Sequence, residues 1–171
     1  MEEEQKVRLA EMLKEHHRSR TLKEWIAKLK QACDYVPSED DFLELEHTRR
    51  LKALFYNKSG SLPHDLCWTR SPNTLQKLGD LITDICISVG QLPVILFSSV
   101  DDVIGATRLP ASRVLAHFEE VWKVTEEDLS LATPNLQHGF RLEINFYCED
   151  SEYVKEGVCE LTTWGAFKLQ A

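Results

Sequence analysis

The sequence has few of the residues that break or crosslink a chain. Its 171 residues include 7 Gly, 6 Pro and 5 Cys, which excludes a collagen-like or linker-rich protein. The cysteine count is odd, no Cys-x-x-Cys spacing occurs, and a chain of this length buries a full core without disulfides. We therefore expect free thiols, a cytoplasmic location and one domain over residues 1–171.

Long hydrophobic runs are also absent. No apolar stretch approaches the length of a membrane span, and the acidic start Met1-Glu2-Glu3-Glu4 lacks the apolar stretch of a secretory signal. A glycine-rich loop that would cradle phosphates is missing as well. From these absences we expect no membrane, no nucleic acid and no cofactor as ligands of this chain.

Positive charge is scarce in the C-terminal part. Residues 1–60 carry 12 basic and 12 acidic residues, and residues 61–100 carry 2 and 3. Residues 101–171 carry 6 basic and 13 acidic residues, so −7 of the total charge of −8 lies there. The charge pattern divides the domain into a neutral helical subregion, 1–60, and an acidic α+β core, 61–171. An acidic surface repels nucleic acid and attracts basic partners.

Helical patterns dominate the first 70 residues. A weakly amphipathic helix is predicted over 2–18, and the capping box Thr21-Leu22-Lys23-Glu24 predicts a second helix after it. Acidic residues 39–41 open a third helix, and residues 57–70 read as a loop. We expect the third helix to bury Leu43, His47, Leu51, Leu54 and Phe55.

Two further helices are expected beyond residue 70. One begins at Pro72 and ends at Gly90, and Leu81 and Ile87 widen its apolar face, which predicts a central position. The other begins at Pro110 and runs through Trp122, and residues 125–128 cap another short turn.

Three segments read as strands. Residues 92–97 form a continuous apolar run, which predicts a strand covered on both faces. Apolar residues alternate with polar ones over 140–148, and 158–164 predicts an antiparallel partner. In a symmetric hairpin Cys148 would lie near Cys159. The expected fold class is α+β, with a helical N-terminal half packed on a small mixed or antiparallel sheet that ends in a β-hairpin.

The clearest candidate for metal binding or catalysis is His64-x-x-Cys67. With Cys86, Cys148 or Cys159 it would supply zinc ligands, and with His64, His117 or His138 as base Cys67 would be a nucleophile. Only one closely spaced ligand pair exists, however, and acidic surroundings raise the pKa of a thiol. We therefore expect buried thiols, with neither a metal site nor a catalytic site.

The remaining charged and aromatic clusters favour protein binding. The carboxylate groups look solvated, as do Arg49, Arg50 and Lys52. Trp122 and Trp164 lie in the acidic half of the chain, near the ends of predicted elements. Each is either an interface residue or a part of the core. The expected partner-binding residues are Glu119, Glu120, Trp122, Glu126, Glu127, Asp128, Glu149, Asp150 and Trp164.

Within residues 92–165 the chain resembles bacterial toxin-immunity proteins. The features are the acidic cap Thr125-Glu126-Glu127-Asp128, the strand entry Gly139-Phe140, the acidic hairpin and the segment Glu160-Leu161-Thr162-Thr163-Trp164-Gly165. The resemblance implies a small cytoplasmic protein that binds a cognate toxin and blocks it.

Two functions are therefore considered. The first is a non-enzymatic binding protein, an inhibitor of a basic toxin or nuclease, because an acidic face with aromatic residues mimics phosphate and speeds association. The second is a small enzyme whose site is assembled from dispersed His and acidic residues. An enzyme should show a deep pocket with convergent polar groups, and an inhibitor a flat or ridged acidic surface.

Overall fold

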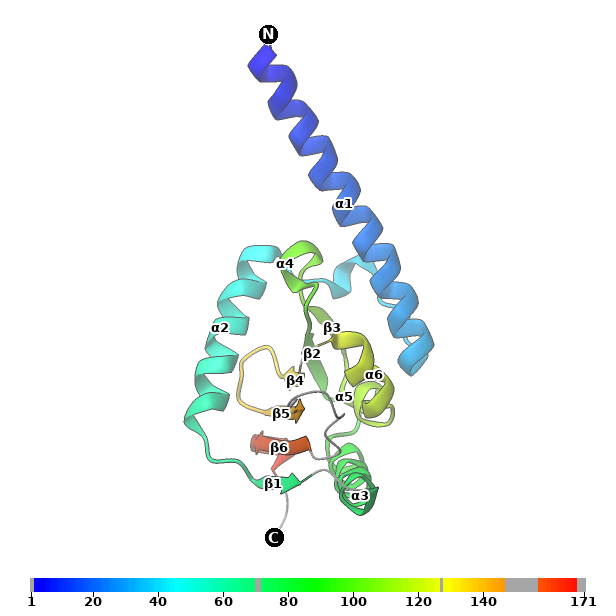
Figure 1. The fold of residues 1–171 in the computed structure, drawn as a ribbon, viewed down its shortest axis with the longest axis vertical. Coiled ribbons are helices and arrows are strands. Elements are labelled where there is room, and N and C mark those ends of the chain that lie inside the picture. The colour runs from blue at the N-terminus through cyan, green and yellow to red at the C-terminus, as the bar shows by residue number, and fades with distance from the viewer. Residues whose placement is uncertain (1, 70–71, 127, 147–156, 169–171) are drawn as a thin grey trace, which may run out of the picture.

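The computed structural model describes residues 2–69, 72–126, 128–146 and 157–168. In this part of the chain a six-stranded antiparallel sheet, in the order β1-β6-β5-β4-β2-β3, lies between two layers of helix (Figure 1). The strands are β1 Leu66–Thr69, β2 Pro93–Phe97, β3 Thr107–Pro110, β4 Leu129–Ala132, β5 Gly139–Phe146 and β6 Gly157–Trp164. The helices are α1 Glu2–Cys33, α2 Leu45–Ser61, α3 Pro72–Val89, α4 Asp101–Ile104, α5 Ala111–Leu115 and α6 Phe118–Thr125, with 3-10 turns η1 Glu39–Asp41 and η2 Gly165–Phe167. The predicted α+β class is confirmed.

One face of the sheet carries the main hydrophobic core, and we call it the closed face. Helices α3, α5 and α6 lie over it, and the second half of α1 packs against α6 (Figure 1). Alternation along β5 directs Phe140 and Leu142 to this side, where both are fully buried. The register places Leu142 between Leu129 of β4 and Leu161 of β6, so a row of leucines crosses the sheet.

The opposite face is only partly covered, because α2 is the one described helix on that side (Figure 1). Phe55 of α2 packs on Phe97 and Trp164, with ring centroids 4.9 and 5.5 Å apart. Beyond α2, the strands β5, β6 and β1 present polar side chains instead. The predicted strand at 92–97 is confirmed as β2, and residues 94–97 are buried from both sides.

The N-terminal helix differs from the prediction. It is one continuous helix through Thr21, so the expected helix start at the capping box is wrong. No Gly or Pro interrupts residues 2–33, and tertiary contacts of Trp25 and Leu29 hold the second half of the helix on the body. The first part projects away from the body (Figure 1), and every residue from 5 to 20 is exposed.

The predicted buried face of the third helix is partly wrong. Helix α2 buries Leu51 and Phe55 as expected, but His47 and Leu54 are exposed. Thr48 replaces them, because its hydroxyl accepts a hydrogen bond from the backbone N–H of Ala106 at 3.0 Å. The helix also continues to Ser61, and β1 follows it, so the expected loop at 57–70 is shorter.

Three later elements also differ. Helix α3 is not central, since it covers only one side of the sheet and Ile87 is 77% exposed. The helix expected from Pro110 is divided at His117 into α5 and α6. The segment after Thr125 leads into strand β4, which was not predicted. In the hairpin, Cys159 pairs with Ile144, and Cys148 lies outside the described residues.

None of the helices in the described part of the chain combines the length and the apolar character needed to cross a bilayer.

A candidate site on the open face of the sheet

A row of polar residues crosses the part of the sheet that α2 leaves uncovered. Cys67 of β1 pairs with Glu160 of β6, and Glu160 pairs with Glu143 of β5. Asp128 precedes the Leu129–Leu142 pair by one residue, which places it beside Glu143. We call these four residues, together with Arg141, the open strip. Because side chains alternate across a strand, the open strip and the leucine row arise from adjacent residues.

Acidic groups outnumber basic ones on the open strip. Arg141 Nη2 lies 2.7 Å from Asp128 Oδ2 and 2.7 Å from Glu143 Oε1, and its guanidinium stacks over the Tyr56 ring at 4.9 Å. The Glu143 side chain is only 18% exposed. Burial raises the pKa of Glu143; Arg141 opposes this effect, and the charges of Asp128 and Glu160 add to it. Burial therefore makes the Glu143 carboxyl harder to ionise than one in open solvent.

His64 reaches the open strip from the segment between α2 and β1. That segment is fixed by Asp65, whose backbone N–H donates to Leu161 O at 2.8 Å and whose carboxylate accepts from Thr163 N at 2.6 Å. The Nδ1 atom of His64 lies 3.0 Å from Thr162 Oγ1, and Nε2 lies 3.8 Å from Glu160 Oε2. One ring nitrogen is therefore oriented by Thr162 while the other faces the carboxylates.

This arrangement has the chemistry of a divalent metal site. One ligand atom from each of His64, Glu143 and Glu160 lies within 4.8 Å of the others. The thiol of Cys67 lies 3.8 Å from Glu160 Oε1 and is exposed. Imidazole, carboxylate and thiolate are the ligands of zinc, and a second hydrogen bond that orients the histidine is usual at such sites.

The sequence indicated only half of this cluster. The spacing His64-x-x-Cys67 was weighed as a ligand pair and set aside in favour of buried thiols, and Glu143 and Glu160 were missed. Their proximity depends on the register of β5 and β6, and the alternation around Phe140 was the one available signal that Arg141 and Glu143 share a face.

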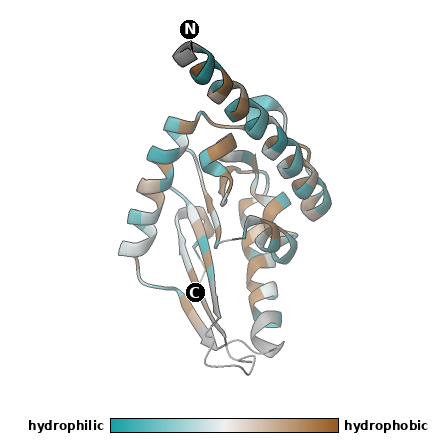
Figure 2. Cartoon of the chain, turned by 45° about the horizontal axis from the view of Figure 1, so that its top comes forward, coloured by the Kyte–Doolittle hydropathy of each residue, from teal (hydrophilic) through white to brown (hydrophobic). Residues whose placement is uncertain are grey.

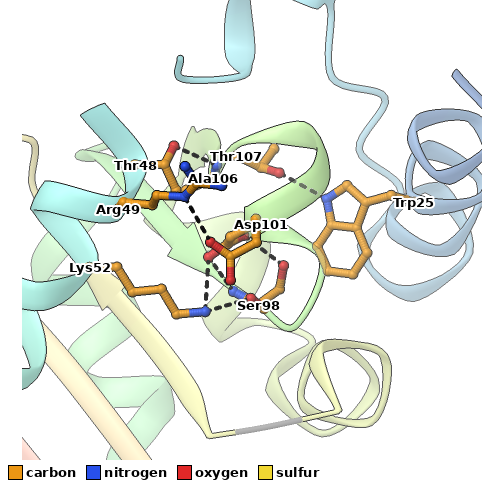
Figure 3. Close-up of polar contacts among 9 residues, drawn as sticks. Trp25, Thr48, Arg49, Lys52, Ser98, Asp101, Ala106 and Thr107 are labelled. Carbon is orange, nitrogen blue, oxygen red and sulfur yellow. Dashed lines mark hydrogen bonds and ion pairs between the residues drawn. The ribbon is translucent and has the colours of Figure 1, made fainter. Parts of the chain in front are cut away.

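A second polar cluster lies at the far end of α2 (Figure 3). Asp101 is 1% exposed and accepts hydrogen bonds from the Ser98 backbone N–H and hydroxyl, both at 2.8 Å. Lys52 Nζ lies 3.6 Å from the Asp101 carboxylate and donates to Ser98 O at 2.8 Å. Burial raises the pKa of Asp101 to about 6, although these hydrogen bonds and Lys52 oppose the shift.

Neighbouring contacts give this cluster a structural role. Trp25 Nε1 of α1 donates to Thr107 Oγ1 of β3 at 2.8 Å (Figure 3). Arg49 of α2 pairs with Asp102 of α4 at 3.3 Å. Together with Lys52, these contacts join three helices to strands β2 and β3. These polar groups contact one another across the fold, so we interpret the cluster as a structural connection between helices and strands.

The structure separates the residues that the sequence predicts to bind a partner. Glu119 and Glu120 are exposed in the first turn of α6, on the closed-face side. Trp122 is half-buried against the main core. Asp128 lies on the other side of the sheet, in the open strip, so the described acidic residues of this set do not form one continuous surface.

Two of the remaining predicted residues have partners within the fold. Glu126 is paired with Lys28 at 2.8 Å. Trp164 is 7% exposed and its indole N–H donates to Leu136 O at 3.0 Å, so it fills the core under α2. Glu127, Glu149 and Asp150 lie outside the described residues.

Two surface hollows are present elsewhere. One, of about 410 Å³, lies along α3 beside Ile87, and the other, of about 470 Å³, lies between α1 and η1. Neither brings His64 together with the carboxylates. Comparisons of the chain with protein family models, with curated proteins and with solved structures found no match.

Proposed function

We propose that this chain is a small binding protein that holds a basic protein partner on its open strip, as an immunity-type inhibitor holds a toxin. The observation that carries the proposal is the pairing of Glu143 directly opposite Glu160. Like charges in opposing positions destabilise a sheet. Arg141 compensates Glu143 and Asp128, and an arginine or lysine from a partner would offset the remaining repulsion.

Partial burial strengthens such a contact. The side chains of Asp128, Glu143 and Glu160 are 27%, 18% and 26% exposed. Charges in a half-buried setting are screened less by salt than fully exposed ones. In the sequence, the connection between β5 and β6 contains two further acidic residues, Glu149 and Asp150. An acidic surface of this kind steers a basic partner and accelerates association.

The exposed acids of α6 provide a matched control. Glu119 and Glu120 occupy the first turn of a helix, where carboxylates interact favourably with the helix dipole. Their presence is therefore explained without a partner. If the open strip is the binding surface, neutralising the two α6 acids should leave association unchanged.

The test compares two double variants with equal loss of charge. Glu143→Gln/Glu160→Gln removes the opposed pair, and Glu119→Gln/Glu120→Gln removes the α6 pair. Association rates would be measured for an oligoarginine peptide and a panel of small basic nucleases, at low and moderate salt. We expect the first variant to lower the on-rate about tenfold at low salt and to flatten its salt dependence. Equal effects of the two variants would show that only the net charge matters and that the open strip is not the binding surface.

A second candidate function is favoured by His64. The cluster His64, Glu143 and Glu160 supports a divalent metal centre. If this chain is a small enzyme, a metal with an open coordination position would supply its catalytic group. A guanidinium needs the carboxylates but not the imidazole, whereas a metal needs both. His64 therefore separates the two functions.

The metal function is tested by calorimetric titration of the protein with Zn²⁺ and with Mn²⁺. Saturable binding of one equivalent that weakens at least tenfold in His64→Gln would support it. The control is His117→Gln, because His117 is exposed and lies on the other side of the sheet, before α6. If His64→Gln instead leaves zinc binding unchanged, the metal candidate is wrong while the basic-partner proposal still stands.

A further inference from the structure

The part of α1 that projects from the body carries apolar side chains in water. We call residues 2–20 the projecting segment. Val7, Leu9, Met12 and Leu13 are 53%, 57%, 63% and 61% exposed. In Figure 2 the segment shows apolar and polar residues side by side along its length. A helix of 19 residues spans about 28 Å and is marginally stable in water without tertiary contacts.

Two of these apolar residues lie near the middle of the segment at coiled-coil spacing, and Val7 lies on the other side of the helix. Leu9 and Met12 are three residues apart, as positions a and d of a heptad are, and Leu13 flanks them. The next equivalent positions are polar, with Gln5 on one side and His16 on the other. The seam is short and centred between residues 10 and 11. A short, centred seam suits a partner helix that carries the same residues in the opposite direction.

Charge along the segment supports the same arrangement. Residues 2–11 carry four acidic and two basic residues, a net charge of −2. Residues 12–20 carry three basic residues and one acidic residue, a net charge of +2. A parallel pair would align like charges, whereas an antiparallel pair aligns opposite ones. The second copy of this chain is therefore an electrostatically complementary partner.

We propose that two copies of this chain associate through an antiparallel pairing of their projecting segments about a two-fold axis. Leu9 of each copy then packs against Met12 of the other. The positions that flank this seam bring Arg8 of each copy beside Glu15 of the other, so two equivalent ion pairs form. The antiparallel direction also places the two bodies at opposite ends of the helix pair. The contact is isologous, so it closes at two copies.

The short seam predicts a weak dimer that depends on concentration. Sedimentation equilibrium of the full chain, over a wide range of concentration, should show a monomer–dimer equilibrium. Leu9→Asp/Met12→Asp should abolish the dimer, since it places charges in the seam. The control is Ile87→Asp, an apolar position on α3 that is more exposed than Leu9 and Met12, which should leave the dimer intact. Circular dichroism would check that each variant keeps the folded body.

The direction of pairing is tested by a charge swap. Arg8→Glu alone and Glu15→Arg alone should each weaken the dimer several-fold, and the double variant should regain most of the parental affinity. In a parallel pair Arg8 would flank Leu13 and Glu15 would flank Arg20, so no rescue would occur. A monomer at every concentration, a dimer that survives Leu9→Asp/Met12→Asp, or a charge swap without rescue would each overturn the proposal. Each of these outcomes is independent of the open strip.

Discussion

Strand β5 shows two chemistries on consecutive residues. Leu142 lies on the closed face between Leu129 and Leu161, under three helices. Glu143, the next residue, faces Glu160 on the open strip, where Arg141 at its side stacks on Tyr56 of α2. The closed face and the smaller core under α2 therefore account for the stability of the sheet, and the open strip holds polar groups whose arrangement stability alone does not explain. The difference identifies the open strip as the place to look for function.

The sharpest way to test this comparison is to alter the two neighbours separately. Leu142→Ala removes a fully buried side chain and should lower the free energy of unfolding by about 2–5 kcal/mol. Glu143→Gln keeps the size of the side chain and removes both the repulsion from Glu160 and the ion pair with Arg141. Because these two losses offset each other, its effect should be below about 1 kcal/mol. Urea unfolding at neutral pH measures both. Similar losses in the two variants would contradict a division of the sheet into two unlike faces.

The part of the second face that α2 covers should respond to pH through Asp101. Its pKa is raised from 3.8 to about 6, so the folded state binds this proton more tightly than the unfolded chain does. The stability that the proton contributes is complete below the unfolded pKa and is lost as the pH rises through about 6. Relative to Asp101→Asn, the parent should lose about 3 kcal/mol of unfolding free energy across this interval.

This prediction requires urea unfolding of parent and variant at several pH values. Asp102→Asn is the control, because Asp102 is exposed and pairs with Arg49 at the surface. Its difference from the parent should show no comparable slope. A pH-independent difference between parent and Asp101→Asn would show that the carboxyl of Asp101 titrates as an ordinary one.

A smaller effect is expected where α2 and the sheet meet under Trp164. A Cβ atom added at Gly139 would lie 2.1 Å from the Trp164 ring, which is itself buried. Gly139→Ala should therefore cost about 1–3 kcal/mol. Gly79→Ala in α3 meets nothing within 4 Å and should stabilise the helix by up to about 1 kcal/mol. Thermal unfolding of the pair gives the sign of each change, and a neutral Gly139→Ala would show that Trp164 moves freely.

The smallest expected effect concerns Ser130, between the core under α2 and the open strip. Its hydroxyl is fully buried and has no hydrogen-bond partner in the described part of the chain. Ser130→Ala should raise the free energy of unfolding by about 1 kcal/mol, because the cost of desolvating the hydroxyl disappears. A loss of stability instead would show that this hydroxyl makes a stabilising hydrogen bond and belongs with the polar groups of the open strip.

Local patterns predicted much of the fold. Alternation over 140–148 predicted strand β5 and the burial of Phe140 and Leu142, and the apolar run at 92–97 predicted β2. Predictions failed where long-range contacts decide the outcome. Thr21 has the sequence of a helix start, but contacts of Trp25 and Leu29 keep it inside a longer helix. Ile87 was expected to widen the buried face of α3. The sheet lies on one side of that helix only, and Ile87 is exposed.

The sequence by itself determined the class of the fold, the acidic balance and the close spacing of His64 and Cys67, because periodicity, charge and spacing are properties of neighbouring residues. Only the tertiary structure decided that Trp164 is core, that the α6 acids and Asp128 lie on opposite sides of the sheet, and that Glu143 meets Glu160 beside His64. The physical reason is strand register. A shift of one residue between β5 and β6 would turn these side chains to the other face, and the burial of the leucine row fixes that register.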